Sequence, residues 1–181
     1  MKIILISDIH GSVTAFRKSL QFAPSCDLIL NAGDVLYHGP RNPIPDGYNP
    51  KELAETINEL NVPFICAAGN CDAAVDQAVL SIPIQAPYAF VCIENLRILV
   101  SHGHETSDDE LFDLAQKWKI DLVVTGHTHV KRLEKKGEIT FINPGSCSLP
   151  KDGSPSIALI EDSIIKLINI DNGEIIKSLE I

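Results

Sequence analysis

Seven side chains of the kinds that bind metal ions occur in five short groups along the chain. They are two aspartates, one asparagine and four histidines: Asp8, Asp34, Asn70, His10, His102, His127 and His129. Hard oxygen donors mixed with imidazoles suit manganese, iron or zinc better than magnesium or calcium, and the set needs no thiolate. If these side chains converge, they could support metal-ion catalysis.

Two of the groups have a spacing of two residues, Asp8-x-His10 and His127-x-His129. In an extended chain such residues face the same side, about 6.6 Å apart at about 3.3 Å per residue. That separation would allow Asp8 and His10 to bind one cation. It would also allow His127 and His129 to flank a pair of cations about 3.5–4 Å apart.

Glycine directly precedes three of the candidate ligands, at Gly33, Gly69 and Gly126. A residue without a Cβ atom lets the chain turn sharply and approach a site closely. We therefore expect tight turns at these positions.

Each group of candidate ligands directly follows an apolar run that predicts a buried strand. These runs cover residues 2–7, 27–31, 62–67, 96–101 and 121–125. In layered α/β folds, ligands bind at the carboxyl ends of strands. Strand ends at a common edge could therefore bring the seven side chains together, although the sequence alone does not prove that they converge.

The remaining segments complete an α/β pattern. Apolar spacing predicts helices over 13–22, 51–60 and 108–119, and Ser12 is a candidate N-cap. Further strands are predicted over 89–93, 132–135, 138–142, 156–160, 164–169 and 174–179. Four prolines and two glycines predict a long loop over 39–50. We expect one α/β domain over residues 1–181, with two stacked sheets and outer helices.

Composition excludes several classes of protein. With 181 residues, 45% of them hydrophobic and 22% charged, the chain is globular rather than disordered. Its formal net charge of −9 makes it a poor general binder of nucleic acids or anionic membranes. The five cysteines include no CxxC pair and indicate reduced thiols. Because no apolar run approaches the length of about 20 residues that a membrane helix needs, we expect a soluble cytoplasmic protein.

The ordered blocks of the sequence resemble the calcineurin-like metallophosphoesterases over nearly the whole chain. The blocks are Asp8-x-His10, Gly33-Asp34, Gly69-Asn70, His102 and Gly126-His127-x-His129. The small bacterial phosphodiesterases of this family are also similar in further segments, which are His38-Gly39-Pro40-Arg41-Asn42, Asn70-Cys71-Asp72, Val75-Asp76-Gln77 and Asn143-Pro144-Gly145-Ser146. A single DxH pair is a weak signal, whereas five ordered blocks with all seven ligand types are specific.

The resemblance implies a calcineurin-like four-layer sandwich, in which two mixed β-sheets pack face to face with helices outside. It also implies a dinuclear site in which Asp8, His10 and His129 bind one divalent ion, Asn70, His102 and His127 bind the other, and Asp34 bridges them. Manganese is the first expectation for both ions, with iron, zinc or nickel as alternatives. A hydroxide activated by the two ions would then hydrolyse a phosphodiester.

Charge arithmetic is consistent with a phosphoester substrate. Two divalent ions, the carboxylates of Asp8 and Asp34 and one hydroxide leave a single positive charge. The site would therefore attract phosphate although the whole chain is acidic.

The sequence departs from many relatives directly after Asn70. Those relatives have a histidine that is thought to assist the leaving group, whereas this chain has Cys71. A thiol with an ordinary pKa near ~8.5 is a poor proton donor to an alkoxide. We therefore expect esters with good leaving groups to be favoured. His38 or Arg41, in the long loop after Asp34, could partly replace the missing histidine by contacting the phosphate.

Two alternative functions remain open from the sequence. One is a phosphomonoesterase or a dinucleoside-polyphosphate hydrolase. The other is a non-catalytic scaffold that resembles the retromer subunit of this fold. The expected partner of an enzyme is a small phosphodiester, with no long nucleic acid and no membrane, and a homodimer or homotetramer is possible. Specificity would depend on the 39–50 loop and its neighbours.

Overall fold

The computed structural model describes every residue from Met1 to Ile181. Its elements in chain order are β1 (Lys2–Ile6), α1 (Val13–Leu20), β2 (Leu28–Asn31), α2 (Pro50–Asn58), β3 (Phe64–Ala67), η1 (Ala74–Ala78), β4 (Ile84–Gln85), β5 (Ala89–Ile93), β6 (Leu96–Val100), α3 (Asp108–Trp118), β7 (Leu122–Val124), β8 (Arg132–Lys136), β9 (Ile139–Asn143), β10 (Ser156–Glu161), β11 (Ile164–Asn169) and β12 (Ile175–Glu180). η1 is a single short 3₁₀ helix.

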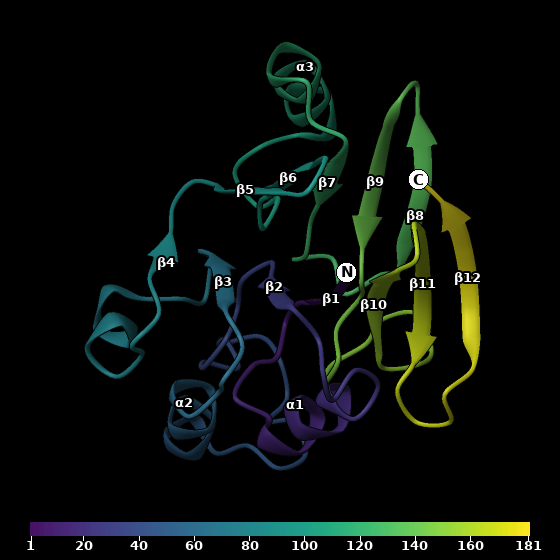
Figure 1. Ribbon diagram of the computed structural model, residues 1–181. Coiled ribbons are helices and arrows are strands. Elements are labelled where there is room, and N and C mark those ends of the chain that lie inside the picture. Colours follow the sequence, from purple (N-terminus) through teal and green to yellow (C-terminus); the bar gives the residue numbers. More distant parts are fainter.

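The strands form two mixed sheets (Figure 1). The first has seven strands in the order β12-β11-β10-β1-β2-β3-β4. Its strands β1 to β4 are parallel, whereas β10, β11 and β12 continue the sheet as antiparallel neighbours. The second sheet has five strands in the order β5-β6-β7-β9-β8, and its three central strands are parallel.

Strand β1 shows why the sheets pack as layers. Successive side chains of a strand point to opposite faces of the sheet. Ile3 and Leu5 therefore enter the core between the two sheets, whereas Ile4 and Ile6 enter the core beneath the helices. A strand buried on both faces has a continuous apolar sequence. Each of these side chains is fully buried, which stabilises the fold by roughly 1.5–3 kcal/mol apiece.

Helices cover the outer face of each sheet. α1 and α2 lie against the seven-stranded sheet, where Phe16 and Leu53 are fully buried. α3 lies on the other side of the molecule, where Leu111 packs with Phe141 of the five-stranded sheet (Figure 1). The layers are therefore helix, sheet, sheet and helix, and the predicted four-layer sandwich is confirmed.

Local signals set the helix ends. Ser12 accepts a hydrogen bond from the Ala15 amide, as an N-cap does. Ser107 and Glu110 form a capping box at the start of α3. α2 begins one residue earlier than predicted, because Pro50 occupies its first turn after the N-cap Asn49. The sequence did not predict η1 or β4, which are too short to show a periodic pattern.

The parallel strands place one set of loops on a common rim. β1, β2 and β3 run in one direction in the first sheet, and β6 and β7 run parallel to each other in the second. The loops that follow these five strands carry the candidate ligands. No helix in the structure has the length and apolar character needed to cross a membrane.

Candidate metal centre

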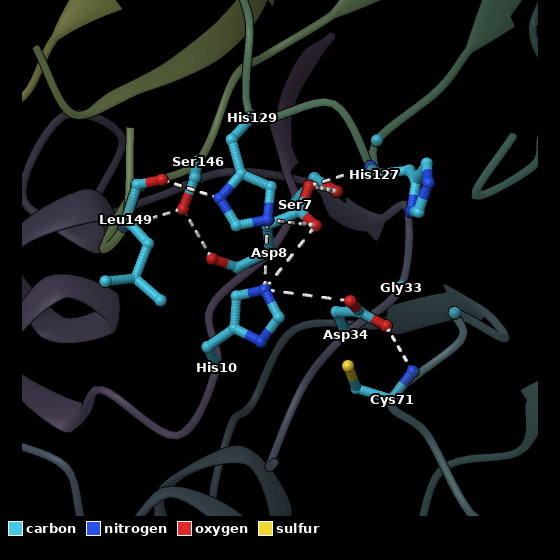
Figure 2. A network of polar contacts seen from close by, with 12 residues as sticks. Ser7, Asp8, His10, Gly33, Asp34, Cys71, His127, His129, Ser146 and Leu149 are labelled. Atoms are coloured by element: carbon cyan, nitrogen blue, oxygen red, sulfur yellow. Dashed lines mark hydrogen bonds and ion pairs between the residues drawn. The ribbon is translucent and has the colours of Figure 1, made fainter. Parts of the chain in front are cut away.

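Asp8, directly beyond β1, is the centre of the cluster (Figure 2). The Ser7 hydroxyl donates to Asp8 Oδ2 over 2.7 Å, and the His127 amide donates to the same oxygen over 3.1 Å. The other oxygen, Oδ1, is buried and has no hydrogen-bond partner. It lies 3.3 Å from His129 Nε2 and 3.7 Å from His10 Nε2. An unpaired buried carboxylate oxygen is costly, and a cation between these atoms would remove the cost.

Backbone carbonyls fix three of the histidine rings. Nδ1 of His10 is 2.8 Å from the Tyr37 oxygen, Nδ1 of His102 is 2.6 Å from the Ala32 oxygen, and Nδ1 of His129 is 2.6 Å from the Leu149 oxygen. Because a carbonyl only accepts, each Nδ1 carries a proton. In the neutral ring Nε2 then presents a lone pair, and such backbone bonds commonly orient metal-binding histidines.

Asp34 joins the two halves of the cluster. Its Oδ2 lies 3.6 Å from His10 Nε2 and 3.4 Å from His102 Nε2, and its Oδ1 accepts a hydrogen bond from the Cys71 amide over 2.8 Å. Burial raises the pKa of the Asp34 carboxyl, but the neighbouring His102 and the Cys71 amide outweigh burial and lower the pKa to about 2. Asp34 is therefore ionised and faces both histidines.

His102 completes the second half with Asn70. Its Nε2 lies 3.2 Å from Asn70 Oδ1. Burial lowers the pKa of His102, but the carboxylates of Asp34 and Asp8 raise it to about 9. The same two carboxylates would attract a metal ion in place of that proton.

His127 is placed differently from the other six candidates. Its ring lies edge-on to the His102 ring at a centroid distance of 5.2 Å. It joins none of the three groups of His, Cys, Asp and Glu side chains whose donor atoms lie within 4.8 Å of one another. Figure 2 shows its imidazole apart from those of His10 and His129. Burial, followed by repulsion from His102, lowers the pKa of His127 and favours the neutral ring that a metal needs.

Five of the seven candidates have left-handed backbone conformations. The φ angles are 53° at Asp8, 49° at His10, 58° at Asp34, 65° at His127 and 58° at His129. Such conformations cost a non-glycine residue roughly 1–2 kcal/mol and concentrate at functional sites. The extended i, i+2 geometry expected from the sequence is therefore wrong for Asp8-x-His10 and His127-x-His129. Across this sharp turn, Asp8 Oδ1 and His10 Nε2 lie 3.7 Å apart.

All three predicted glycines are required by space. A Cβ atom on Gly69 would lie 2.1 Å from Asp34 Oδ1, and one on Gly126 would lie 2.1 Å from Ser7 Oγ. Neither glycine has a positive φ. Gly33 combines a φ of 99° with a close approach to the His102 ring. The structure therefore confirms the expected close approach of the chain at these positions.

Asp72 holds two of the loops together, a role that the sequence did not reveal. Its carboxylate accepts hydrogen bonds from the amides of Asp34, Val35 and Gly69, each over 2.8 Å. Burial, opposed by these bonds, raises the pKa of Asp72. The carboxylate links the end of β2 to the end of β3, and so positions Asp34 relative to Asn70.

The 143–148 segment supports the cluster from the other side. Ser146 and Ser148 donate hydrogen bonds to the Asp8 carbonyl over 2.7 and 3.1 Å. Asn143 donates to the Gly126 carbonyl over 2.7 Å. These bonds satisfy the carbonyls of Asp8 and Gly126, which lie beyond the ends of their strands and outside the hydrogen-bond pattern of the sheets.

A cavity of about 720 Å³ opens over the cluster. Arg41 lines this cavity, as does Lys151, which the sequence did not single out. His38 does not line it. The His38 ring instead packs edge-on against Tyr37 and Tyr48, at centroid distances of 4.8 and 5.1 Å. Of the two residues expected to contact phosphate, Arg41 therefore lines the cavity and His38 does not.

The donor atoms fit the demands of metal ions. Ligands that bind one ion at about 2.0–2.2 Å lie roughly 2.8–3.6 Å from one another. The separations among Asp8, His10, His129, Asp34 and His102 are 3.2–3.7 Å, and the side chains are buried. The oriented rings and the unpaired Asp8 oxygen complete the fit.

A four-layer α/β sandwich with carboxylates and imidazoles gathered at one rim defines a metal-dependent phosphoesterase. The chain belongs to the calcineurin-like phosphoesterase superfamily, whose domain matches residues 1–163. It is 41% identical to phosphodiesterase YfcE of Escherichia coli K12 over 184 residues, which cover 100% of this chain and 98% of that protein. It is also 25% identical to phosphodiesterase MJ0936 of Methanocaldococcus jannaschii, over 89% of this chain and 93% of that one.

Solved structures agree with this assignment. A structure of YfcE, a phosphoesterase from E. coli, superposes with a TM-score of 0.89 at 37% identity, and covers 100% of both chains. Vps29 from Entamoeba histolytica superposes with a TM-score of 0.70 at 20% identity, over 100% of this chain and 99% of that one. The second match shows only that the fold is shared.

Proposed function

We propose that the protein is a metal-dependent phosphodiesterase with a dinuclear site. Asp8, His10 and His129 hold one divalent ion, Asn70, His102 and His127 hold the other, and Asp34 binds both. The observation that carries this proposal is the convergence of three oriented Nε2 atoms on Asp8 Oδ1 and Asp34 Oδ2. Since both sheets contribute ligands, residues 1–181 act as one domain.

Manganese is the metal that we expect, with iron, zinc or nickel as alternatives. The donor set combines imidazoles with carboxylate and amide oxygens, which suits these ions better than magnesium or calcium. When bound, a pair of such ions lowers the pKa of water and neutralises charge on a phosphoryl group. His127 is included in the site because its ring lies beside that of His102 and its backbone amide donates to Asp8.

The chain's own residues position the substrate. Arg41 lines the cavity and offers a planar fork of N–H donors, which binds phosphate oxygens in pairs. Cys71 lies beside Asp34, and the side-chain amide of Asn70 donates a hydrogen bond to the Cys71 sulfur over 3.2 Å. Burial, followed by the negative charge of Asp34, raises the pKa of the Cys71 thiol to about 12. Such a thiol is a poor general acid at neutral pH.

The weak acid at position 71 favours diesters whose leaving group departs without a proton. Aryl and nucleotidyl esters are of this kind, whereas alkyl monoesters are not. The matched relative YfcE is named a phosphodiesterase, which supports the same substrate class. The net charge of −9 and the small cavity favour a small phosphodiester over a long nucleic acid or a membrane surface.

The test compares two chromogenic esters after metal removal and reloading with Mn²⁺. We expect bis-p-nitrophenyl phosphate to be hydrolysed with a higher kcat/KM than p-nitrophenyl phosphate. Equal or faster turnover of the monoester would contradict the proposal and favour a phosphomonoesterase. Metal-loaded protein that cleaves neither ester would favour the scaffold alternative.

A further inference from the structure

Two positively charged side chains line the cavity over the metal centre from different loops. Arg41 belongs to the loop after β2, and Lys151 belongs to the loop between β9 and β10. Neither has a carboxylate oxygen within 4.0 Å, although eight of the chain's lysines and arginines are paired in this way. Both charges are therefore free to meet a negatively charged ligand.

Lys151 lies beside a metal ligand because of a backbone hydrogen bond. Its amide donates to the His129 carbonyl over 3.0 Å. Two residues earlier, the Leu149 carbonyl accepts from His129 Nδ1 over 2.6 Å. The 149–151 segment thus brackets His129, and the side chain of Lys151 is placed at the cavity wall next to it.

The carboxylate nearest in sequence to Lys151 is already occupied. Asp152 accepts a hydrogen bond from the Lys131 amide over 2.6 Å and also pairs with the Lys131 ammonium group. Lys131 and Asp152 are both mostly buried in this pair. Asp152 therefore does not neutralise Lys151, which is exposed and lines the cavity.

Arg41 and Lys151 serve different parts of the cavity. The Arg41 loop packs against Cys71, since a Cβ on Gly39 would lie 2.9 Å from Cys71 Sγ. Lys151 is held at His129 instead. With the Asp72 carboxylate that also lines the cavity counted, the loaded metal centre, Arg41 and Lys151 leave two positive charges, one more than a phosphodiester neutralises. Since Arg41 is assigned to the phosphate at the metal centre, Lys151 is available for a second phosphate.

We propose that Lys151 binds a second phosphate on the substrate, so that the preferred substrates are small organic phosphodiesters bearing a further phosphate. This inference rests on the proposed function and specifies its substrate class. The cavity has the volume of a typical small-molecule site and could hold a nucleotide with two phosphates. One phosphate lies at the metal centre and the other at the Lys151 ammonium group.

Direct binding to Mn²⁺-loaded protein tests this without relying on turnover. The probes are thymidine 5′-monophosphate, thymidine 5′-diphosphate and thymidine 3′,5′-bisphosphate, each titrated by calorimetry with excess Mn²⁺ present. They contain no phosphodiester to be cleaved and stand in for the phosphate groups of the substrate. We expect at least one of the two probes with two phosphates to bind about tenfold more tightly than the monophosphate, as one charge-assisted hydrogen bond would provide.

Three variants test whether Lys151 is the source of the preference for probes with two phosphates. In Lys151→Gln, the affinity for the probes with two phosphates is expected to come within about twofold of the affinity for the monophosphate. Lys151→Arg keeps most of the preference. Lys177→Gln on β12 makes the same change in net charge far from the cavity and keeps the wild-type ratio. Equal affinities in the wild-type protein, or an unchanged ratio in Lys151→Gln, would overturn the proposal.

The outcome is separable from that of the proposed function. Hydrolysis of bis-p-nitrophenyl phosphate by the wild-type protein decides whether the chain is a phosphodiesterase. A Lys151-dependent preference without hydrolysis would contradict the proposed enzymatic function while keeping the second phosphate site. Hydrolysis without the preference would keep the enzyme and remove the site.

Discussion

Nε2 of His10 and Nε2 of His129 lie 3.2 Å apart, and in the neutral rings neither nitrogen carries a proton. Each ring donates its Nδ1 proton to a backbone carbonyl, from Tyr37 and Leu149 respectively. Two lone pairs at this distance repel each other unless a cation lies between them. The carbonyls thus hold the two imidazoles in an arrangement that a metal ion stabilises.

Removal of metal should therefore destabilise the fold. A metal present at about 100 times its Kd stabilises the folded state by about 2.7 kcal/mol, which corresponds to a rise in Tm of about 5–10 °C for a chain of this length. We expect calorimetric scans of chelator-treated protein to show a lower Tm, and addition of Mn²⁺ to restore it. Coincident Tm values with and without Mn²⁺ would contradict the assignment of the cluster as a metal site.

The shared carboxylate of Asp34 provides the second prediction. Asp34→Asn removes the negative charge that faces both His10 and His102. The NH2 group of the new side chain replaces one carboxylate oxygen, so a hydrogen-bond donor stands where an acceptor was. We expect elemental analysis to show the loss of at least half of the bound metal, and diester turnover to fall by at least about a thousandfold. Asp113→Asn, an exposed change on α3, is the matched control and should behave as wild type. An active Asp34→Asn enzyme would refute the bridging role.

The fold and the positions of most candidate ligands could be predicted from the sequence because they depend on local patterns. The apolar run of β1 and the polar residues that directly follow it mark a buried strand ending at a site. The same pattern after β2, β3, β6 and β7 indicated a common rim. Glycine before Asp34, Asn70 and His127 indicated close approach of the chain, which the contacts of Gly69 and Gly126 explain.

Other features depend on contacts between distant segments and could not be predicted. The left-handed backbone of Asp8 is stabilised by hydrogen bonds from Ser146 and Ser148 to its carbonyl, about 140 positions away in the chain. Asp72 acquires its role only when β2 and β3 lie side by side. Likewise, Lys151 reaches the cavity through the carbonyl of His129, and nothing in the local sequence near Lys151 shows this pairing.

A methyl group at position 69 should disable the site and also destabilise the fold. In Gly69→Ala the Cβ would lie 2.1 Å from Asp34 Oδ1 and 2.5 Å from the Asp34 amide nitrogen, so both the carboxylate and the backbone of Asp34 must move. We expect diester kcat/KM to fall by at least about a hundredfold, since misplacing a reacting group by about 1 Å can cost that much.

The control for Gly69→Ala is Gly137→Ala in the turn between β8 and β9. Gly137 has a φ of 63° and no atom within 4 Å of the added Cβ. Its substitution should lower the free energy of unfolding by roughly 1–2 kcal/mol, from backbone strain alone, and leave turnover intact. If urea unfolding and kinetics show equal losses of unfolding free energy and of turnover in both variants, crowding of Asp34 is not the reason that position 69 needs glycine.

The last prediction concerns Cys71, whose sulfur belongs to a group with His10 and Asp34 that could in principle hold a metal. Burial, followed by the charge of Asp34, raises the pKa of this thiol to about 12, so that it is not an efficient acid at neutral pH, and the seven proposed ligands complete the metal site without it. Cys71→Ser should therefore retain its metal content and its kcat/KM for bis-p-nitrophenyl phosphate within about threefold, as should the exposed control Cys92→Ser. A selective loss of one metal equivalent in Cys71→Ser would instead make the sulfur a ligand, since a serine hydroxyl does not replace a thiolate on a soft metal ion.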